Sequence, residues 1–96
     1  VSQKSAQAWY LYLIKNNLGQ YYCGVTTDVE RRFNEHAASG VKCAKALRGK
    51  GPLSLCFQAQ LSSRRHALQA EYWVKQQSVK VKQAIIAGTL MLPDET

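Results

Sequence analysis

The chain has 96 residues, of which 46% are hydrophobic and 20% are charged. These values are typical of a globular protein, and the length suits a single domain. They exclude a disordered or fibrous chain, and no run of apolar residues approaches the ~18 that a membrane helix needs.

The charge balance is strongly basic, with 13 lysines and arginines against 6 acidic residues and a net charge of +7. Such an excess indicates a polyanionic partner, nucleic acid ahead of an acidic membrane surface, although solubility alone is the simpler explanation. The cysteines form no CxxC pair and are odd in number, which argues against a disulfide framework or a cysteine zinc site. Because no signal-peptide pattern is present, we expect a cytoplasmic protein.

Residues 9–14 (WYLYLI) predict a first strand, whose even-numbered residues share one face and whose odd-numbered residues share the other. Residues 16–19 (NNLG) supply turn residues, so a hairpin leads into a second strand at residues 20–25. A turn centred on Asn17 would place Tyr12 directly opposite Tyr22, with both phenols on one face.

A helix follows the hairpin. Thr27 and Glu30 form a capping-box pattern that predicts a helix beginning at Asp28, and Gly40 is its expected end. Its core-facing residues recur at helical spacing and are Val29, Phe33 and Ala37. Arg32 and His36 lie four residues apart on a neighbouring stripe, while Arg31 and Glu35 are expected to pair on the outside.

The remaining chain predicts one strand and two helices. Residues 41–51 (VKCAKALRGKG) predict a short, basic, exposed helical turn, and residues 53–61 alternate as a strand. Ser62 or Ser63 caps a helix over residues 63–77, and Ser78 caps a last helix that ends at Gly88. We therefore expect an N-terminal extension at 1–7, a single domain at 8–88, and a partly frayed tail at 89–96. The fold class is α/β of the α+β type, a small three-stranded antiparallel sheet flanked by helices.

Glu71 is the only acidic residue between Glu35 and Asp94, in a stretch that is otherwise basic. It shares a core-facing helical stripe with Ala67, Ala70 and Val74. An unpaired carboxylate on such a face is costly, so Glu71 needs a cationic partner. Two readings are open: an ion pair with a lysine or arginine, or a ligand to magnesium, which uses one or two carboxylates and keeps several waters.

The candidate residues occur in a recognisable order. Tyr10-Leu11-Tyr12 is followed by Tyr22-Cys23-Gly24, and then by Arg32, His36 and Glu71. This order resembles the GIY-YIG nuclease family over roughly residues 8–80. The segments GVTTDVERRFNEH, AKALRGKGPL and ALQAEYWVKQ are most similar to its small, stand-alone, YhbQ-like bacterial members.

The resemblance implies a metal-dependent hydrolysis of phosphodiester bonds. Tyr12 or Tyr22 would help deprotonate the attacking water, and the sequence leaves open which of them does so. Arg32 would neutralise charge on the phosphoryl oxygens, His36 would orient groups or relay protons, and Glu71 would hold Mg²⁺ or Mn²⁺.

The substrate expected from charge and resemblance together is DNA, cut with structure selectivity or weak sequence specificity, in repair or recombination. RNA stays an alternative, as does a nucleic-acid-binding module of the same fold that does not cut; a purely structural partner domain is a weaker third reading. We expect a monomer or weak dimer with no membrane partner. The candidate nucleic-acid-binding residues are Lys42, Lys45, Arg48, Lys50, Arg64 and Arg65.

Overall fold

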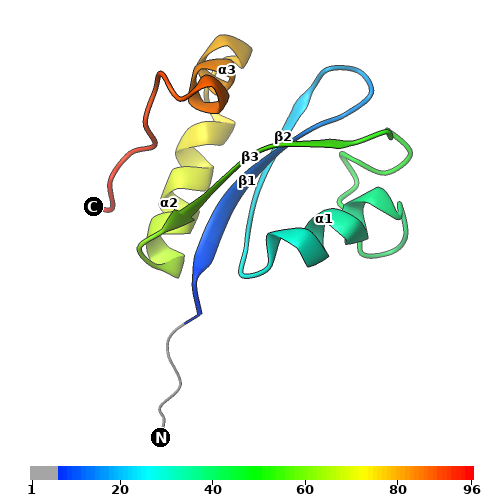
Figure 1. Ribbon diagram of the computed structural model, residues 1–96, viewed down its shortest axis with the longest axis horizontal. Coiled ribbons are helices and arrows are strands. Elements are labelled where there is room, and N and C mark those ends of the chain that lie inside the picture. Colours follow the sequence, from blue (N-terminus) through cyan, green and yellow to red (C-terminus); the bar gives the residue numbers. More distant parts are fainter. Residues whose placement is uncertain (1–6) are drawn as a thin grey trace, which may run out of the picture.

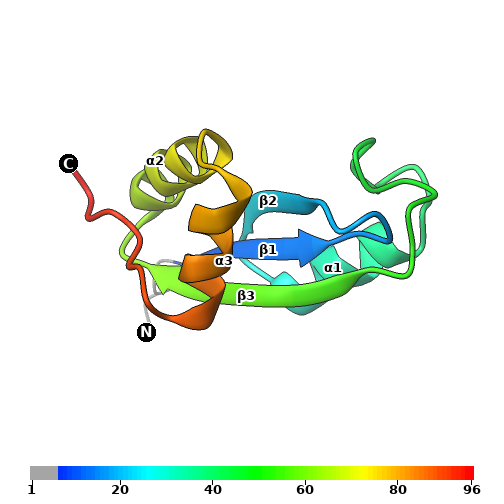
Figure 2. The same cartoon turned by 90° about the horizontal axis from the view of Figure 1, so that it is seen from above.

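The computed structural model describes residues 7–96 and contains one sheet between two layers of helix (Figures 1 and 2). The strands are β1 (Trp9–Lys15), β2 (Tyr21–Thr26) and β3 (Ser54–Leu61), and they pair antiparallel in the order β2-β1-β3. Helix α1 (Val29–Ala37) covers one face, while α2 (Arg64–Lys75) and α3 (Val79–Ala87) cover the other. The predicted fold class is confirmed; the predicted extension at 1–7 falls almost wholly outside the described residues. Among those described, no helix combines the length and apolarity needed to cross a membrane.

Strand β1 is central and is buried on both faces, whereas its alternating pattern predicts burial on at least one. Leu11 and Leu13 belong to a first core on the side of α2 and α3. Tyr12 and Ile14 belong to a second core on the side of α1. The second core also takes in Cys43 and Leu47 from the segment after α1. Both cores therefore depend on this one strand.

The β1–β2 hairpin forms as predicted, but its register differs from the one expected. Asn16 is 7% exposed, and its side-chain Oδ1 accepts the amides of Leu18 at 2.8 Å and Gln20 at 3.0 Å. These two hydrogen bonds close a loop that is longer than a turn centred on Asn17. As a result, Tyr12 pairs with Gly24 and not with Tyr22. Tyr22 pairs with Ile14 and therefore lies diagonal to Tyr12 on the same face.

Helix α1 begins with a different cap from the predicted one. Asp28 is the N-cap residue, and its Oδ1 accepts the amide of Arg31 at 3.0 Å. The capping box on Thr27 is wrong, because the Asp28 carboxylate already satisfies the amide of the first turn. Arg32, not Arg31, pairs with Glu35. The helix ends at Ala37, before Gly40.

The basic segment 41–51 is not a helix. It consists of successive turns, in which the amides of Cys43, Leu47 and Lys50 donate to carbonyls three residues earlier. Cys43 and Leu47 are buried in the second core, so only part of the segment is exposed as predicted. The amide of Asn17 donates to the carbonyl of Lys50 at 2.9 Å, which ties the segment to the hairpin loop.

Strand β3 alternates in sequence as predicted, but a bulge switches its faces. Leu13 pairs with Phe57 and Ile14 pairs with Leu55, which leaves Cys56 as an extra residue. Phe57 consequently packs in the first core, whereas Leu53, before the bulge, packs in the second.

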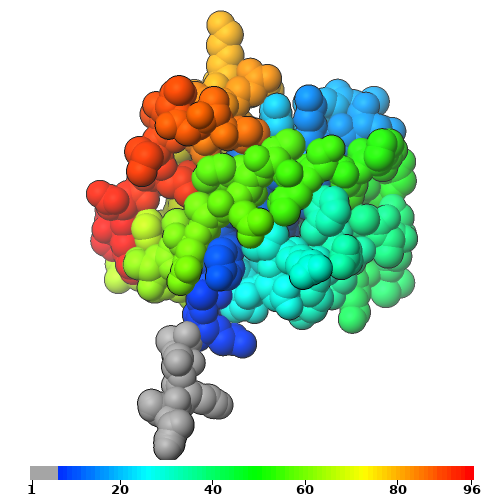
Figure 3. Space-filling view, viewed as in Figure 1, coloured from blue at the N-terminus to red at the C-terminus, as the bar shows by residue number. Residues whose placement is uncertain are grey.

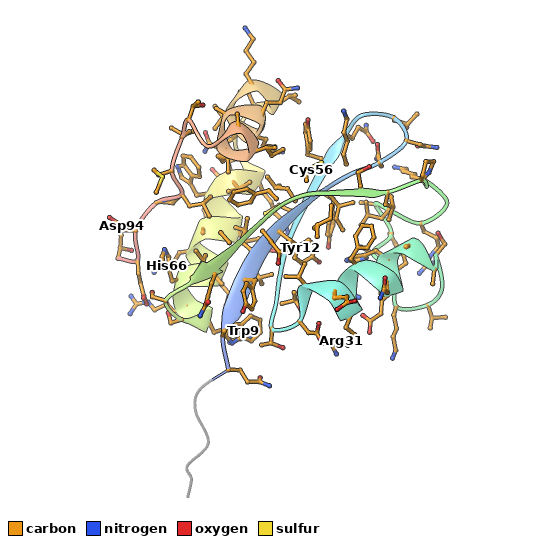
Figure 4. All side chains as sticks on the ribbon, viewed as in Figure 1. Trp9, Tyr12, Arg31, Cys56, His66 and Asp94 are labelled. Carbon is orange, nitrogen blue, oxygen red and sulfur yellow. The ribbon has the colours of Figure 1, made fainter. Side chains whose placement is uncertain are left out.

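The two last helices begin where serine caps are predicted, with Ser63 accepting the amide of His66 and Ser78 accepting that of Val81. The C-terminal tail does not fray as expected. His66 Nε2 lies 2.8 Å from the Pro93 carbonyl, and Leu92 packs against the first core. Figure 4 shows His66 and Asp94 on the same side of the molecule, where the tail runs beside α2.

Replacing Asn16 by alanine is expected to lower the free energy of unfolding by about 1–2 kcal/mol, because two loop amides lose their acceptor. Asn17→Ala is the matched control, because the Asn17 side chain is exposed and its removal leaves the backbone bond to Lys50 intact. Its effect on the free energy of unfolding should stay within about 0.5 kcal/mol. Urea unfolding followed by circular dichroism measures both. Equal midpoints for the two variants would contradict the role assigned to Asn16.

Candidate active site

Three of the predicted site residues form an aromatic cluster between the sheet and α1. The ring centroids lie 6.3 Å apart for Tyr12 and Tyr22, 6.0 Å for Tyr12 and His36, and 5.4 Å for Tyr22 and His36. Figure 4 places Tyr12 at the centre of the molecule, on the sheet. The hairpin supplies the two phenols and the last turn of α1 supplies the imidazole. The cluster thus joins three elements.

The tautomer of His36 follows from its two hydrogen bonds. The ring is 0% exposed, and its Nδ1 accepts the amide of Ala44 at 3.2 Å. A backbone amide only donates, so the proton of the neutral ring is on Nε2, which donates to the Tyr12 hydroxyl oxygen at 3.0 Å. Burial, and then the charge of Arg32, lower the pKa of His36. His36 is therefore a neutral donor that orients Tyr12.

Tyr12 is the more enclosed phenol, with 2% of its surface exposed. Burial raises its pKa, the neighbouring Tyr22 raises it further, and Arg32 offsets part of this effect. Because its oxygen already accepts from His36, its own proton is free to be donated to another acceptor. The ring lies over Gly24, where any Cβ would collide with the hydroxyl group.

Arg32 is held in a fixed orientation at the edge of this cluster. Its Nη1 donates to Glu35 Oε1 at 2.9 Å and to the carbonyl of Lys42 at 2.6 Å. Its positive charge is felt by both Tyr12 and His36, whose pKa values it lowers. The structure therefore brings Arg32 beside the cluster, and its guanidinium can neutralise an anion there.

Glu71 approaches the sheet from the opposite side. It belongs to α2, and its Oε2 lies 3.1 Å from Lys75 Nζ. Its negative charge, after burial, helps to raise the pKa of the Cys23 thiol to about 12, which places the carboxylate near β2. Cys23 packs in the first core, so Glu71 and the aromatic cluster lie on different faces of the edge strand. No hydrogen bond among residues 7–96 joins Glu71 to the other four predicted site residues.

The acidic residues described here do not form a closed metal cage. Across residues 7–96 no group of three or more histidine, cysteine, aspartate or glutamate side chains could hold an ion. Magnesium does not require such a group, because it takes one or two carboxylates and completes its shell with water and substrate phosphate. Glu71 fits that requirement. Its partner Lys75 has a 52% exposed side chain, and such a pair contributes only ~0–1 kcal/mol and exchanges readily.

The predicted nucleic-acid-binding residues lie in two places. Lys42, Lys45 and Arg48 are exposed in the segment after α1, and Lys50 is half-buried there. Arg64 and Arg65 begin α2, where Arg64 lies 5.6 Å from the centroid of the Trp9 ring. Trp9 pairs with Leu61 and Lys15 pairs with Ser54, so these two basic groups flank opposite ends of the sheet.

Two contacts near the candidate site had no signal in the sequence. The Ala44 amide fixes the His36 tautomer, yet a backbone donor eight residues away leaves no pattern of residue types. Lys82 lies close enough to β2 for its charge to lower the pKa of Cys23, against the larger effect of burial. Its position in an ordinary helical stretch concealed this proximity.

Gly24→Ala is expected to destabilise the protein by about 1–3 kcal/mol, because the new methyl group must displace the Tyr12 ring or the strand. The loss should appear in urea unfolding. Gly40→Ala is the control, since a Cβ at that position meets no atom within 4 Å. A Gly24→Ala protein as stable as the Gly40→Ala protein would show that Tyr12 is not held over Gly24.

His36 should make stability depend on pH. Its pKa in the folded state lies below the ordinary value of 6.5, so the unfolded chain binds the proton more readily. The stability that the buried neutral imidazole contributes is fully present above pH 6.5. The free energy of unfolding should fall as the pH drops below that value. Urea unfolding at a series of pH values from 7.5 down to about 5 measures this slope, which His36→Gln should reduce. An unchanged slope in the variant would contradict the assignment of a buried neutral imidazole.

Comparison with known proteins identifies the family of the chain. The family model of the GIY-YIG catalytic domain matches residues 8–84. A UPF0213 protein of Vibrio campbellii is 45% identical over 92 residues, which covers 96% of this chain and 86% of the relative. The UPF0213 protein YhbQ of Escherichia coli O8 is 51% identical over 79 residues, which covers 82% of this chain and 77% of the relative.

A solved structure is also similar to this chain. The solution NMR structure of a UPF0213 protein from Bacillus halodurans has a TM-score of 0.54 and 36% sequence identity, and the match covers 83% of each chain. The matched region of the family model contains both tyrosines, Arg32, His36 and Glu71. The chain therefore belongs to the GIY-YIG family, and its relatives there are small bacterial proteins that carry the name UPF0213.

Proposed function

We propose that the protein is a nuclease that hydrolyses phosphodiester bonds in DNA with the help of a divalent metal ion. The observation that supports this most directly is the cluster in which a neutral histidine positions one of two phenols beside a fixed arginine. Membership of a family defined by a catalytic domain supports it as well. Structure-selective or weakly sequence-specific cutting, in repair or recombination, belongs to the same proposal, with RNA as the alternative substrate.

The two tyrosines receive different roles. Tyr12 is buried, its oxygen accepts from His36, and its raised pKa keeps it protonated, so it acts as a hydrogen-bond donor to the phosphate. Tyr22 is only half-buried and has no hydrogen-bond partner among residues 7–96. We assign to Tyr22 the oxygen that takes the proton of the attacking water while its own hydroxyl proton passes to solvent.

Arg32 provides positive charge where negative charge develops on the phosphoryl oxygens. Glu35 and the Lys42 carbonyl orient its guanidinium before substrate arrives, so little reorganisation is needed during the reaction. His36 acts through Tyr12 and is a positioning residue in this scheme.

Glu71 is the residue that would hold the metal ion. Its single carboxylate is sufficient for magnesium or manganese when water and substrate phosphate complete the shell. The bound cation would supply Lewis-acid stabilisation of the phosphate and of the leaving oxygen. To serve this role, Glu71 must release Lys75, a partly exposed partner.

A binding module of the same fold is the second candidate. The observation that favours it is the pairing of Glu71 with Lys75, which leaves the carboxylate neutralised without any metal. Both candidates bind nucleic acid with a dependence on salt, because lysine and arginine displace counterions from phosphate. Only cleavage separates them.

The decisive experiment measures cutting of labelled single-stranded, duplex and branched DNA, with magnesium, with manganese and with a chelator. Wild-type protein should cut only with metal. Tyr22→Phe and Glu71→Ala should each lower the rate by roughly 10²-fold or more while DNA binding persists. Glu30→Ala removes an equal charge from the outer surface of α1 and should leave the rate unchanged.

Two outcomes would overturn the proposal. Binding without cutting by the wild-type protein on every substrate would leave the binding module as the function. Cutting that Glu71→Ala does not affect would remove the carboxylate from the mechanism.

A further inference from the structure

A groove of about 360 Å³ opens at the hairpin end of β2, next to the aromatic cluster. The hairpin loop, the segment 41–50 and α3 all contribute to its walls, through residues such as Tyr21, Lys50 and Lys82. In Figure 3, α3 and the hairpin loop lie next to each other along the upper edge of the molecule. Since β2 is an edge strand, the groove crosses the open side of the sheet.

The charge in the groove is entirely positive. Lys50 and Lys82 are its ionic lining residues, and no acidic residue lines it. Both lysines are partly buried, and neither forms a salt bridge within the described residues. They come from segments that cover opposite faces of the sheet, yet they line one groove. Two unpaired ammonium groups in a concave site form a site for an anion.

The walls of the groove are fixed in place. The carbonyl of Lys50 accepts the amide of Asn17 at 2.9 Å, so the residue is tied to the hairpin loop that Asn16 closes. Lys82 donates its amide to Ser78 within the first turn of α3, which is anchored by the buried Ile85. The backbone positions that carry the two lysines are thus fixed before any ligand binds, which reduces the entropic cost of binding.

Tyr22 connects this groove to the candidate active site, because it lines the groove and also belongs to the aromatic cluster. Tyr21, the preceding residue, lines the groove with a ring on which a base can stack. The volume falls near the lower end of the ~300–1,000 Å³ of small-ligand sites, which suits one nucleotide and not a duplex.

We propose that this groove binds one unpaired nucleotide that flanks the bond to be cut, with its phosphate on Lys50 and Lys82 and its base against Tyr21. The inference rests on the proposed function and adds the substrate class to it. The preferred substrate is a nucleic acid with a single-stranded end or flap adjoining the cleavage point. A fully paired duplex does not fill the groove.

The test measures binding of a fluorescently labelled single strand and of a matched hairpin duplex by anisotropy, with a chelator present so that nothing is cut. Lys50→Gln/Lys82→Gln should weaken single-strand binding by about tenfold, with a smaller effect on the duplex. The dependence of log K on log salt should become shallower by about 0.7 for one lost phosphate contact. Arg31→Gln/Lys80→Gln removes the same charge from exposed positions outside the groove and should change single-strand binding less than threefold.

A second pair of variants tests the stacking of a base on Tyr21. Tyr21→Ala should weaken single-strand binding by roughly tenfold. Tyr72→Ala, which removes a tyrosine that is 73% exposed on α2, should leave it within twofold. Urea midpoints establish that each variant is folded.

The inference would be overturned if the groove variant Lys50→Gln/Lys82→Gln and the control variant Arg31→Gln/Lys80→Gln lost equal single-strand affinity. It would also be overturned if the groove variant lost equal affinity for single strand and duplex. Either result would indicate a diffuse electrostatic surface. Absence of single-strand binding by the wild-type protein would overturn the inference too. Because no cutting is measured, these outcomes are independent of the nuclease proposal, which depends on the cleavage experiment alone.

Discussion

The burial of β1 on both faces is the constraint on which the rest of the structure depends. Its four residues from Leu11 to Ile14 are at most 2% exposed, and they supply the first core on one side and the second core on the other. A small domain has little apolar surface to bury, so a central strand that serves two cores uses each residue fully. The arrangement also gives the candidate site residues a rigid base, because Tyr12 is both a core residue and a candidate site residue.

That dual role explains the chemistry of the site. A phenol inside a core must satisfy its hydroxyl group, and His36 does so from α1, while the Ala44 amide fixes the imidazole from its other side. The chain of donors runs from backbone amide to imidazole to phenol, so the proton of the Tyr12 hydroxyl group is left available. Gly24 is needed opposite it, because the ring occupies the space of a side chain. Packing, hydrogen bonding and the proposed reaction therefore depend on the same few atoms.

The edge strand β2 organises the charged residues. Glu71 and Lys75 lie on its α2 side, Arg32 lies with the aromatic cluster on its α1 side, and Lys50 and Lys82 meet at its hairpin end. An unpaired strand edge is a liability for aggregation, and surrounding it with charge is a usual protection. In the proposed function, the lysines and the arginine among these charges hold a polyanion along the edge.

The sequence by itself determined the order of the three strands and three helices, the amphipathic faces of β1 and of α2, the serine caps, and the family to which the chain belongs. These features depend on residue type and local spacing, so they can be read without coordinates. The hairpin register could not be read, because the buried Asn16 side chain closes a longer loop than its neighbours suggest. The Asp28 cap and the Arg32–Glu35 pair depended on competition between adjacent residues. Only the tertiary structure decided that Tyr12 is held by His36, that Glu71 lies across β2 from the cluster, and that Lys50 and Lys82 share a groove. Each of these is a relation between segments that are far apart in the chain, and their spacing carries no periodic signal.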